Sequence, residues 1–362
     1  MANTSITIYP QYNSNQITVI NCGTSSPRLS GTVDISAFSN LQDFRCNSND
    51  ITSLSGYNNN NSNLQTLQFF DNKISGQIPS LSGLTNLQFF RCETNQLTGP
   101  IPSLSGLNNL QRFYCHQNQL TGPIPSLSGL TSLLFFQCHT NQLTGPIPSL
   151  SGLNSLQRFY CHQNQLTGPI PSLSGLTNLL DFICNDQTGT IKLTGSIPNL
   201  SGLTSLQRFY CNQNQLTGPI PSLSGLTDLQ DFICYTNLLT GPIPSLSGLT
   251  NLQVFQCHTN QLTGPIPSLS GLNSLQRFYC HQNQLTNFDG GSVSNTLGEF
   301  LAYTNFLTST AVNAILAAFV AANRTTGTRI LNLGGYGNAA PTGQGITNKA
   351  TLISRGWTVT TN

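Results

Sequence analysis

Charge is the scarcest feature of this 362-residue chain. Only 7% of its residues are Asp, Glu, Lys or Arg, far below the usual quarter, and only three of them are lysines. With a formal net charge of +2, the chain lacks the dense Lys and Arg stripe that nucleic-acid binding requires. Ser, Thr, Asn, Gln and Gly fill the polar positions, so solubility must rest on neutral hydrogen-bonding groups. We therefore expect no nucleic-acid partner.

Long apolar runs are also absent. No segment is long and apolar enough to span a membrane, and the first residues, MANTSITIYPQYNSNQ, lack the basic leader and apolar core of a secretory signal. We expect a soluble chain made in the cytoplasm, without membrane insertion. Its neutral, lysine-poor surface is nevertheless typical of a protein that works outside cells. The missing secretory signal and the neutral composition both fit an extracellular or virion-associated protein that is released by lysis. A secretory signal that had been removed from the chain would give the same sequence pattern.

What the chain does have is repetition. The letters RFYCHQNQLTGPIPSLSGL occupy residues 112–130 and return unchanged at 158–176. Cysteines recur at intervals of 23 from Cys92 to Cys280, apart from one interval of 27 that ends at Cys211. About a dozen coils share this frame. The periodicity predicts one elongated array, in which each coil packs only on its neighbours, in place of several globular domains.

Each coil follows one pattern, which from Leu110 to Pro125 reads Leu-x-x-Phe-x-Cys-x-x-Asn-x-Leu-x-Gly-x-Ile-Pro. This resembles the leucine-rich repeat, LxxLxLxxNxL, and its LxGxIP subclass known from plant receptor ectodomains, over roughly residues 41–308. The resemblance implies an α/β solenoid with a parallel β-sheet on its concave face. The paired-cysteine caps and kinase domain of the plant receptors are not found in the sequence, so receptor signalling is not implied.

Side-chain alternation divides the strand segment of each coil between core and surface. Leu110, Phe113 and Cys115 are predicted to point into the core. Asn118 is expected to turn the chain and to bond backbone groups from coil to coil. Phe69, Cys46 and Ala302 occupy the cysteine column of other coils, which predicts an apolar core position. We therefore expect buried free thiols, without disulfides or metal, and leave Cys22 open because it lies outside the frame.

Both ends of such an array need a cover. Residues 1–40, with the strand-like runs ITIY and ITVI, are predicted to form an N-terminal cap over the array of residues 41–308. Residues 309–362 are predicted to form a mixed α/β cap that resembles the terminal segments of bacterial and phage leucine-rich-repeat proteins. Here Ser309 or Thr310 starts a helix, and ITNKATLISRGWTVTTN predicts a second helix ended by Gly356 and a closing strand. The apolar stripe of the first helix is Val312, Ile315, Leu316, Phe319 and Val320.

The outward strand positions vary between coils while the core positions stay fixed, and they are rich in Arg, Tyr, Phe, His and Gln. Aromatic rings and Arg anchor interfaces, and a concave solenoid face offers them an extended strip. The alternative is that duplication copied one acceptable surface. All five histidines follow the cysteine column directly. The candidate ligand-binding residues are Arg112, Tyr114, His116, His139, Arg158, Tyr160, His162, Arg208, Tyr210, Tyr235, His258, Arg277, Tyr279 and His281.

Metal binding and glycoside hydrolysis are less consistent with these residues than recognition is. Three parallel, solvent-facing imidazoles without a carboxylate behind them are a poor zinc site, although they would resist being charged together. Asp181 and Asp231, about 9.6 Å apart across two coils, approach the spacing of an inverting glycosidase. Arg208 between them favours an ion-pair ladder instead. We expect no enzyme, cofactor or metal.

Regular hydroxyl columns on the opposite face raise the possibility of ice binding, with turn chemistry as the alternative. The columns are Thr98, Thr121, Thr144, Thr167, Thr194, Thr217, Thr240, Thr263 and Thr286, and Ser103, Ser126, Ser149 and Ser172.

The sequence favours a non-enzymatic recognition protein, an adhesin or receptor-binding component of a phage virion or bacterial surface. The expected ligand is a surface glycan or a surface protein. A structural spacer or a self-associating filament subunit is the alternative, and ice binding is the third hypothesis.

Overall fold

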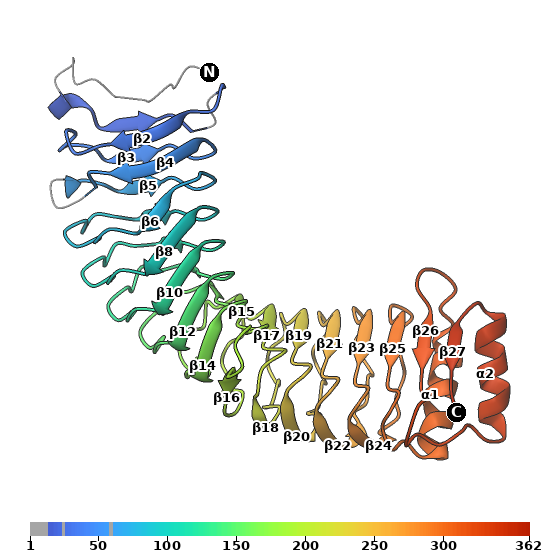
Figure 1. The fold of residues 1–362 in the computed structure, drawn as a ribbon. Helices are drawn as coiled ribbons and strands as arrows, with labels where there is room; N and C mark the ends of the chain where they lie inside the picture. Colours follow the sequence, from blue (N-terminus) through green and yellow to red (C-terminus); the bar gives the residue numbers. More distant parts are fainter. Residues whose placement is uncertain (1–13, 24–25, 58–60) are drawn as a thin grey trace. The chain divides into compact units, whose positions relative to one another are not determined.

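The computed structural model describes residues 14–23, 26–57 and 61–362 (Figure 1). It divides into two compact units, Met1–Leu179 with Gln187–Lys192, and Leu180–Asp186 with Leu193–Asn362. Each unit is a stack of similar coils in which three-residue strands pair in parallel with the strands of the neighbouring coils. The predicted α/β solenoid of about a dozen coils with a parallel sheet is therefore confirmed.

The strands of unit 1 form one long parallel sheet and a second, shorter one. Phe135 lies opposite both Arg112 and Arg158, so equivalent residues of successive coils stand side by side in the long sheet. That sheet contains β1 (Val19–Asn21), β3 (Asp43–Arg45), β5 (Thr66–Gln68), β7 (Phe89–Arg91), β9 (Arg112–Tyr114), β11 (Phe135–Gln137) and β13 (Arg158–Tyr160). The second contains β6 (Ser75–Gln77), β8 (Gln96–Pro100), β10 (Gln119–Pro123), β12 (Gln142–Pro146) and β14 (Gln165–Pro169).

The first described coils of unit 1 carry smaller elements. These are the 3-10 helix η1 (Ser14–Gln16) and the pair β2 (Ser30–Asp34) and β4 (Asp50–Ser55). The predicted strand run ITVI contributes to β1, which pairs with β3. The run ITIY lies outside the described residues.

Unit 2 repeats the arrangement, with strands of the long sheet and of a shorter sheet. Its long sheet contains β15 (Asp181–Ile183), β17 (Arg208–Tyr210), β19 (Asp231–Ile233), β21 (Val254–Gln256), β23 (Arg277–Tyr279), β25 (Glu299–Leu301), β26 (Ile330–Asn332) and β27 (Thr358–Thr360). Its shorter sheet contains β18 (Thr217–Pro219), β20 (Leu238–Pro242), β22 (Gln261–Ile266) and β24 (Gln284–Phe288), and β16 (Leu193–Thr194) precedes it in the chain.

The core is a column of stacked side chains, as predicted. Leu110, Phe113 and Cys115 are fully buried. Phe113 stacks on Phe136 of the next coil with ring centroids 5.4 Å apart and an interplanar angle of 11°. Because the coils are in register, each Phe repeats this contact and the apolar surface is buried between neighbours.

The cysteine column is apolar and its thiols form no disulfides. Ten of the eleven cysteines are buried without a disulfide, and Cys22 is half-buried. Burial raises the pKa of the Cys115 thiol well above its ordinary value. Phe69 and Ala302 are buried in the same column, which confirms that the position belongs to the core.

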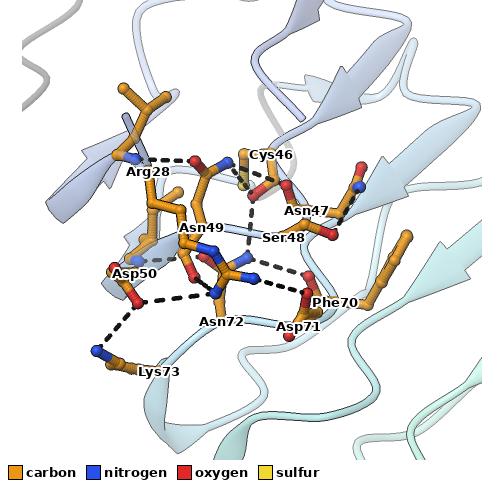
Figure 2. A network of polar contacts seen from close by, with 12 residues as sticks. Arg28, Cys46, Asn47, Ser48, Asn49, Asp50, Phe70, Asp71, Asn72 and Lys73 are labelled. Carbon is orange, nitrogen blue, oxygen red and sulfur yellow. Dashed lines mark hydrogen bonds and ion pairs between the residues drawn. The ribbon is translucent and has the colours of Figure 1, made fainter. Parts of the chain in front are cut away.

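An asparagine ladder joins the coils. Asn118 Nδ2 donates to the carbonyls of Cys92 and Cys115 at 3.1 Å, and Asn118 Oδ1 accepts from the Leu97 N–H at 3.0 Å. This confirms the predicted role of the column. Figure 2 shows the first rungs, where Asn72 donates to the Cys46 carbonyl at 2.9 Å.

Charged groups surround those first rungs in a network that the sequence did not reveal (Figure 2). Lys73 lies 3.0 Å from Asp50, and Arg28 lies 3.9 Å from Asp50 and 3.5 Å from Asp71. These side chains are partly exposed, so the pairs contribute little individually.

The C-terminal segment contains the two predicted helices. Helix α1 (Ser309–Ala322) begins at one of the two predicted residues, and its N-cap Thr308 accepts from the Ala311 N–H at 3.2 Å. Val312, Ile315, Leu316 and Phe319 are buried as predicted. Val320 is only half-buried, and Ala311 is buried in the stripe instead.

Helix α2 (Gln344–Ser354) begins two residues before the predicted start at Ile346. Gly356, at φ 81°, follows it, and the chain then enters β27. Trp357 is buried edge-on against Phe319 of α1, with ring centroids 5.2 Å apart.

Candidate functional site

The candidate residues lie on the outward side of the long sheets. In each three-residue strand the middle side chain enters the core, so the first and third point outward, as does the residue after the cysteine. We call these positions the unit 1 face, from β3 to β13, and the unit 2 face, from β15 to β25. The in-register pairing places equivalent residues of neighbouring coils in columns.

Three predicted histidines form a stack on the unit 1 face. The His116 and His139 rings lie 4.3 Å apart at an interplanar angle of 19°, and the His139 and His162 rings lie 4.3 Å apart at 8°. Tyr114 lies edge-on to His116, with centroids 6.2 Å apart, and Tyr160 lies 6.3 Å from both His139 and His162. The structure therefore brings these five predicted residues together.

The stacked imidazoles are half-buried, so the expectation that they face solvent was only partly correct. Burial is the main cause that lowers the pKa of His116 to about 4 and that of His139 to about 3, with a smaller contribution from neighbouring cations or histidines. These two rings are neutral at physiological pH. They then offer uncharged donors and acceptors, as in the contact of 3.1 Å between His139 Nδ1 and Thr140 Oγ1.

Guanidinium groups and aromatic rings alternate beside this stack. Arg112 Cζ lies 5.4 Å from the centroid of Phe89 and 5.3 Å from that of Phe135, one coil on either side. Arg158 Cζ lies 5.4 Å from the same Phe135 ring. These separations are in the range of cation–π attraction. Phe89 and Phe135 were not among the predicted site residues. Their alternation with Arg at the same strand position of successive coils could have identified them from the sequence.

A second such group lies on the same face. Arg91 Cζ lies 4.0 Å from the centroid of Phe70 and 5.3 Å from that of Tyr114. Arg91 Nε also donates to Glu93 at 2.8 Å. Burial raises the pKa of Glu93, and the Arg91 contacts partly offset this. The cations of this face are thus held in place by rings and carboxylates.

The unit 2 face carries a longer aromatic stack. Tyr235, His258, His281 and Tyr303 follow one another with centroids 4.4, 4.2 and 4.2 Å apart. Burial lowers the pKa of both histidines to about 4. His281 is only 7% exposed. His281 therefore packs against its neighbours and offers little contact surface, although the sequence predicted it as a surface residue.

The remaining predicted residues of this face, two arginines and two tyrosines, contact carboxylates. Arg208 lies 3.5 Å from Asp181 and 3.9 Å from Asp231, as expected for an ion-pair ladder. The Tyr210 hydroxyl donates to Asp231 at 2.6 Å. Burial, together with this hydrogen bond, raises the pKa of Tyr210.

Arg277 and Tyr279 both contact the same carboxylate, Glu299. Arg277 lies 3.6 Å from Glu299. Burial and the hydrogen bond to Glu299 raise the pKa of Tyr279 to about 12. The polar groups of the unit 2 face are therefore largely satisfied within the protein.

The hydroxyl columns differ from each other. Ser103 Oγ accepts from the Ser105 N–H at 3.3 Å, and the other serines of the column do the same, which confirms turn chemistry for them. The threonines lie on the shorter sheets, where Thr121 stands opposite Pro100 and Gln142. The threonines of successive coils are therefore staggered along the strands and do not face one another.

The described residues contain neither a cluster of metal-ligating side chains nor a membrane-spanning helix. No group of three or more His, Cys, Asp or Glu within them is placed to hold a metal ion. None of the helices there combines the length and apolar character needed to cross a membrane.

Solved structures with a similar fold are leucine-rich-repeat proteins. The crystal structure of PEPR1-AtPEP1 matches with a TM-score of 0.67 and 26% identity, over 82% of this chain and 47% of that chain. The ectodomain of the plant receptor kinase GASSHO1/SCHENGEN3 from Arabidopsis thaliana matches with a TM-score of 0.67 and 24% identity, over 89% of this chain and 44% of that chain. YopM from Yersinia enterocolitica matches with a TM-score of 0.55 and 23% identity, over 81% of this chain and 57% of that chain.

These likenesses, with the 23-residue coil, define the fold as that of a leucine-rich-repeat protein. The chain spans about half the length of the two plant proteins. No family model matches the chain, and no curated protein does.

Proposed function

We propose that this protein is a non-enzymatic recognition protein that binds a surface glycan or a surface protein through the outward faces of its long sheets. The observation that carries the proposal is the stack of half-buried rings and guanidinium groups on the unit 1 face. Each of these side chains is held by its neighbours in the adjacent coils. A ligand would therefore meet groups whose rotamers are already fixed, which reduces the entropic cost of binding.

The residue types support the same conclusion. Tyr and Arg are the side chains that most often anchor interfaces, and neutral imidazoles supply directional hydrogen bonds. A similar fold is seen in PEPR1-AtPEP1 and in RGFR1, whose structure is described as a complex with RGF2. Solenoid proteins use an extended concave surface for binding, so we assign the ligand to the long-sheet face.

We further propose an extracellular or virion-associated setting, in which the chain acts as an adhesin or receptor-binding component of a phage virion or bacterial surface. Its neutral, lysine-poor composition favours this setting. Residues 1–40 and 309–362 would act as caps on the array of residues 41–308. Caps at both ends favour a discrete binding protein over end-to-end growth, because exposed strand edges would otherwise pair. Self-association therefore remains the alternative proposal.

The test compares binding of the native protein with that of Tyr114→Ala and Tyr160→Ala, on a glycan array and in a pull-down from intact cell surfaces. Removing an aromatic anchor from a recognition face should weaken binding roughly tenfold or more. Tyr336→Ala is the matched control, because Tyr336 is 85% exposed and lies in the C-terminal segment. If no form binds either target, or if all three variants bind like the native protein, the recognition proposal fails.

The alternative is tested on the same preparation. Sedimentation velocity at high protein concentration should show a single monomeric species if the protein acts as a discrete binder. Ordered oligomers or fibres would instead support a filament subunit.

A further inference from the structure

Arg112 differs from the other arginines of the two faces in its surroundings. It is exposed, and it forms no ion pair with any residue that the structure describes. Phe89 and Phe135 of the adjacent coils contact its guanidinium group from either side. The ring contacts leave the N–H groups as the part that a ligand can reach.

The charge of the two faces also differs. On the unit 1 face the cations outnumber the anions by two, since the charged residues are Arg45, Arg91, Arg112 and Arg158 against Asp43 and Glu93. On the unit 2 face the anions outnumber the cations by one, since they are Arg208 and Arg277 against Asp181, Asp231 and Glu299. An anionic ligand is therefore favoured on the unit 1 face only.

The uncharged groups around Arg112 are suited to hydroxyl groups. Tyr114, Gln137 and the stacked imidazoles of His116 and His139 are half-buried, and each carries a polar group able to bond a hydroxyl. None of the large apolar side chains that the described residues leave exposed belongs to the unit 1 face beside Arg112. A peptide would meet few exposed apolar side chains there, whereas a sugar needs polar contacts and flat rings.

Building on the proposed function, we infer that the unit 1 face recognises a carboxylate-bearing glycan, and that Arg112 binds the carboxylate. The planar guanidinium can pair with both oxygens of one carboxylate, which gives it selectivity over a neutral sugar. Tyr114 and the histidine stack would then contact the ring hydroxyls beside it. The ligand class is thus an acidic sugar chain such as a polyuronate.

The experiment uses oligogalacturonate as the probe and its methyl ester as the neutral counterpart. Binding to the full-length protein is measured by biolayer interferometry in about 50 and about 200 mM NaCl, because exposed charge pairs weaken with salt. Arg112→Gln removes the charge, and Arg112→Lys keeps the charge but loses the planar fork. Arg28→Gln is the control for the loss of one positive charge, because Arg28 lies outside both faces and pairs with Asp50 and Asp71.

We expect the native protein to bind the acid about tenfold or more tightly than the ester, with weaker binding at higher salt. Arg112→Gln should abolish that preference, Arg112→Lys should retain part of it, and Arg28→Gln should leave it unchanged. Equal binding of acid and ester, or an equal loss in Arg112→Gln and Arg28→Gln, would overturn the inference.

Two further outcomes separate this inference from the proposed function. Equally tight binding of polyglutamate would assign the face to acidic peptides and overturn the glycan class. If oligogalacturonate does not bind while Tyr114→Ala still loses binding to the glycan array or to cells, the recognition proposal stands and the carboxylate assignment fails.

Discussion

Asn164 offers the most direct test of how the coils are held together. Its side chain is fully buried. Nδ2 donates to the carbonyls of Cys138 and Cys161 at 3.1 Å and of His162 at 3.2 Å, while Oδ1 accepts from the Leu143 N–H at 3.0 Å. Replacing Asn164 with Ala removes all four hydrogen bonds. It leaves the Leu143 N–H in the core without this acceptor.

The cost can be worked out from these contacts. Leaving a buried donor unsatisfied costs about 1–3 kcal/mol, and each of the three lost carbonyl contacts about 0.5–1 kcal/mol. Losing each carbonyl contact costs the smaller amount because the carbonyl still accepts a hydrogen bond from another donor. The Cys138 carbonyl, for example, still accepts from Asn141. We therefore expect Asn164→Ala to lower the free energy of unfolding by roughly 2.5–6 kcal/mol.

Urea unfolding followed by circular dichroism measures this change, provided that the slope of the transition is unchanged. Asn109→Ala is the matched control. Asn109 is exposed and donates a single bond, to the Thr85 carbonyl at 3.0 Å, so its loss should cost about 0.5 kcal/mol or less. Equal effects of the two substitutions would refute the argument that buried side-chain bonds between coils hold the array together.

Asn164→Gln adds a second comparison, because Gln187 already fills the equivalent position of the next coil. Gln187 Oε1 accepts from the Leu166 N–H at 3.0 Å, and its Nε2 donates to the Cys161 carbonyl at 3.3 Å. A glutamine can thus make the acceptor contact and at least one of the donor contacts. Asn164→Gln should therefore be less destabilising than Asn164→Ala.

Three further predictions concern the core, the histidines and the thiols. Phe136→Ala removes a fully buried ring that stacks on both sides, so it should cost about 3–5 kcal/mol in urea unfolding, and a cost below 1 kcal/mol would contradict the stacked core. Because burial lowers the pKa of His139 to about 3, the unfolded chain takes up the proton first, and stability should fall as the pH drops from about 6.5 toward 3. His139→Gln should flatten that decline in the urea midpoint, and an unchanged slope would contradict the assignment. Iodoacetamide at about pH 8 should modify native protein only at Cys22 but all eleven cysteines after unfolding, as counted by mass spectrometry, and several native adducts would show that the cysteine column is accessible.

The interior of the coil could be predicted from the sequence because it depends on local periodicity. Phe113, Cys115 and Asn118 each recur every 23 residues, and a residue that returns at one phase of a stacked coil meets its own copy. Burial, stacking and the asparagine bonds follow from that one fact. The helix of residues 309–322 was predictable for a similar reason, since its apolar stripe has the helical period.

The turn after the histidine column was not predictable in this way. Gln117 and Thr140 have φ of 53° and 54°, a left-handed conformation that sequence rules assign to Gly, Asn or Asp. The next residue in each case is the ladder asparagine, whose bonds to the flanking coils fix its position. The tertiary bonds therefore impose a conformation that the residue itself does not favour. The half-burial of the histidines escaped prediction too, because it depends on close contact with the rings of the neighbouring coils.

The outward faces show most clearly what repetition leaves undetermined. Residues 112–121 and 277–286 are identical, yet Arg112 lies between two Phe rings while Arg277 lies 3.6 Å from Glu299. Tyr279 bonds the same glutamate. The residues beside the Arg differ in both adjacent coils, Phe89 and Phe135 in one case and Val254 and Glu299 in the other. These neighbours decide whether a copied Arg stacks on rings or forms an ion pair within the protein. Function in such an array is therefore set by pairs of adjacent coils, and a search for binding residues should compare each coil with its neighbours instead of with the consensus.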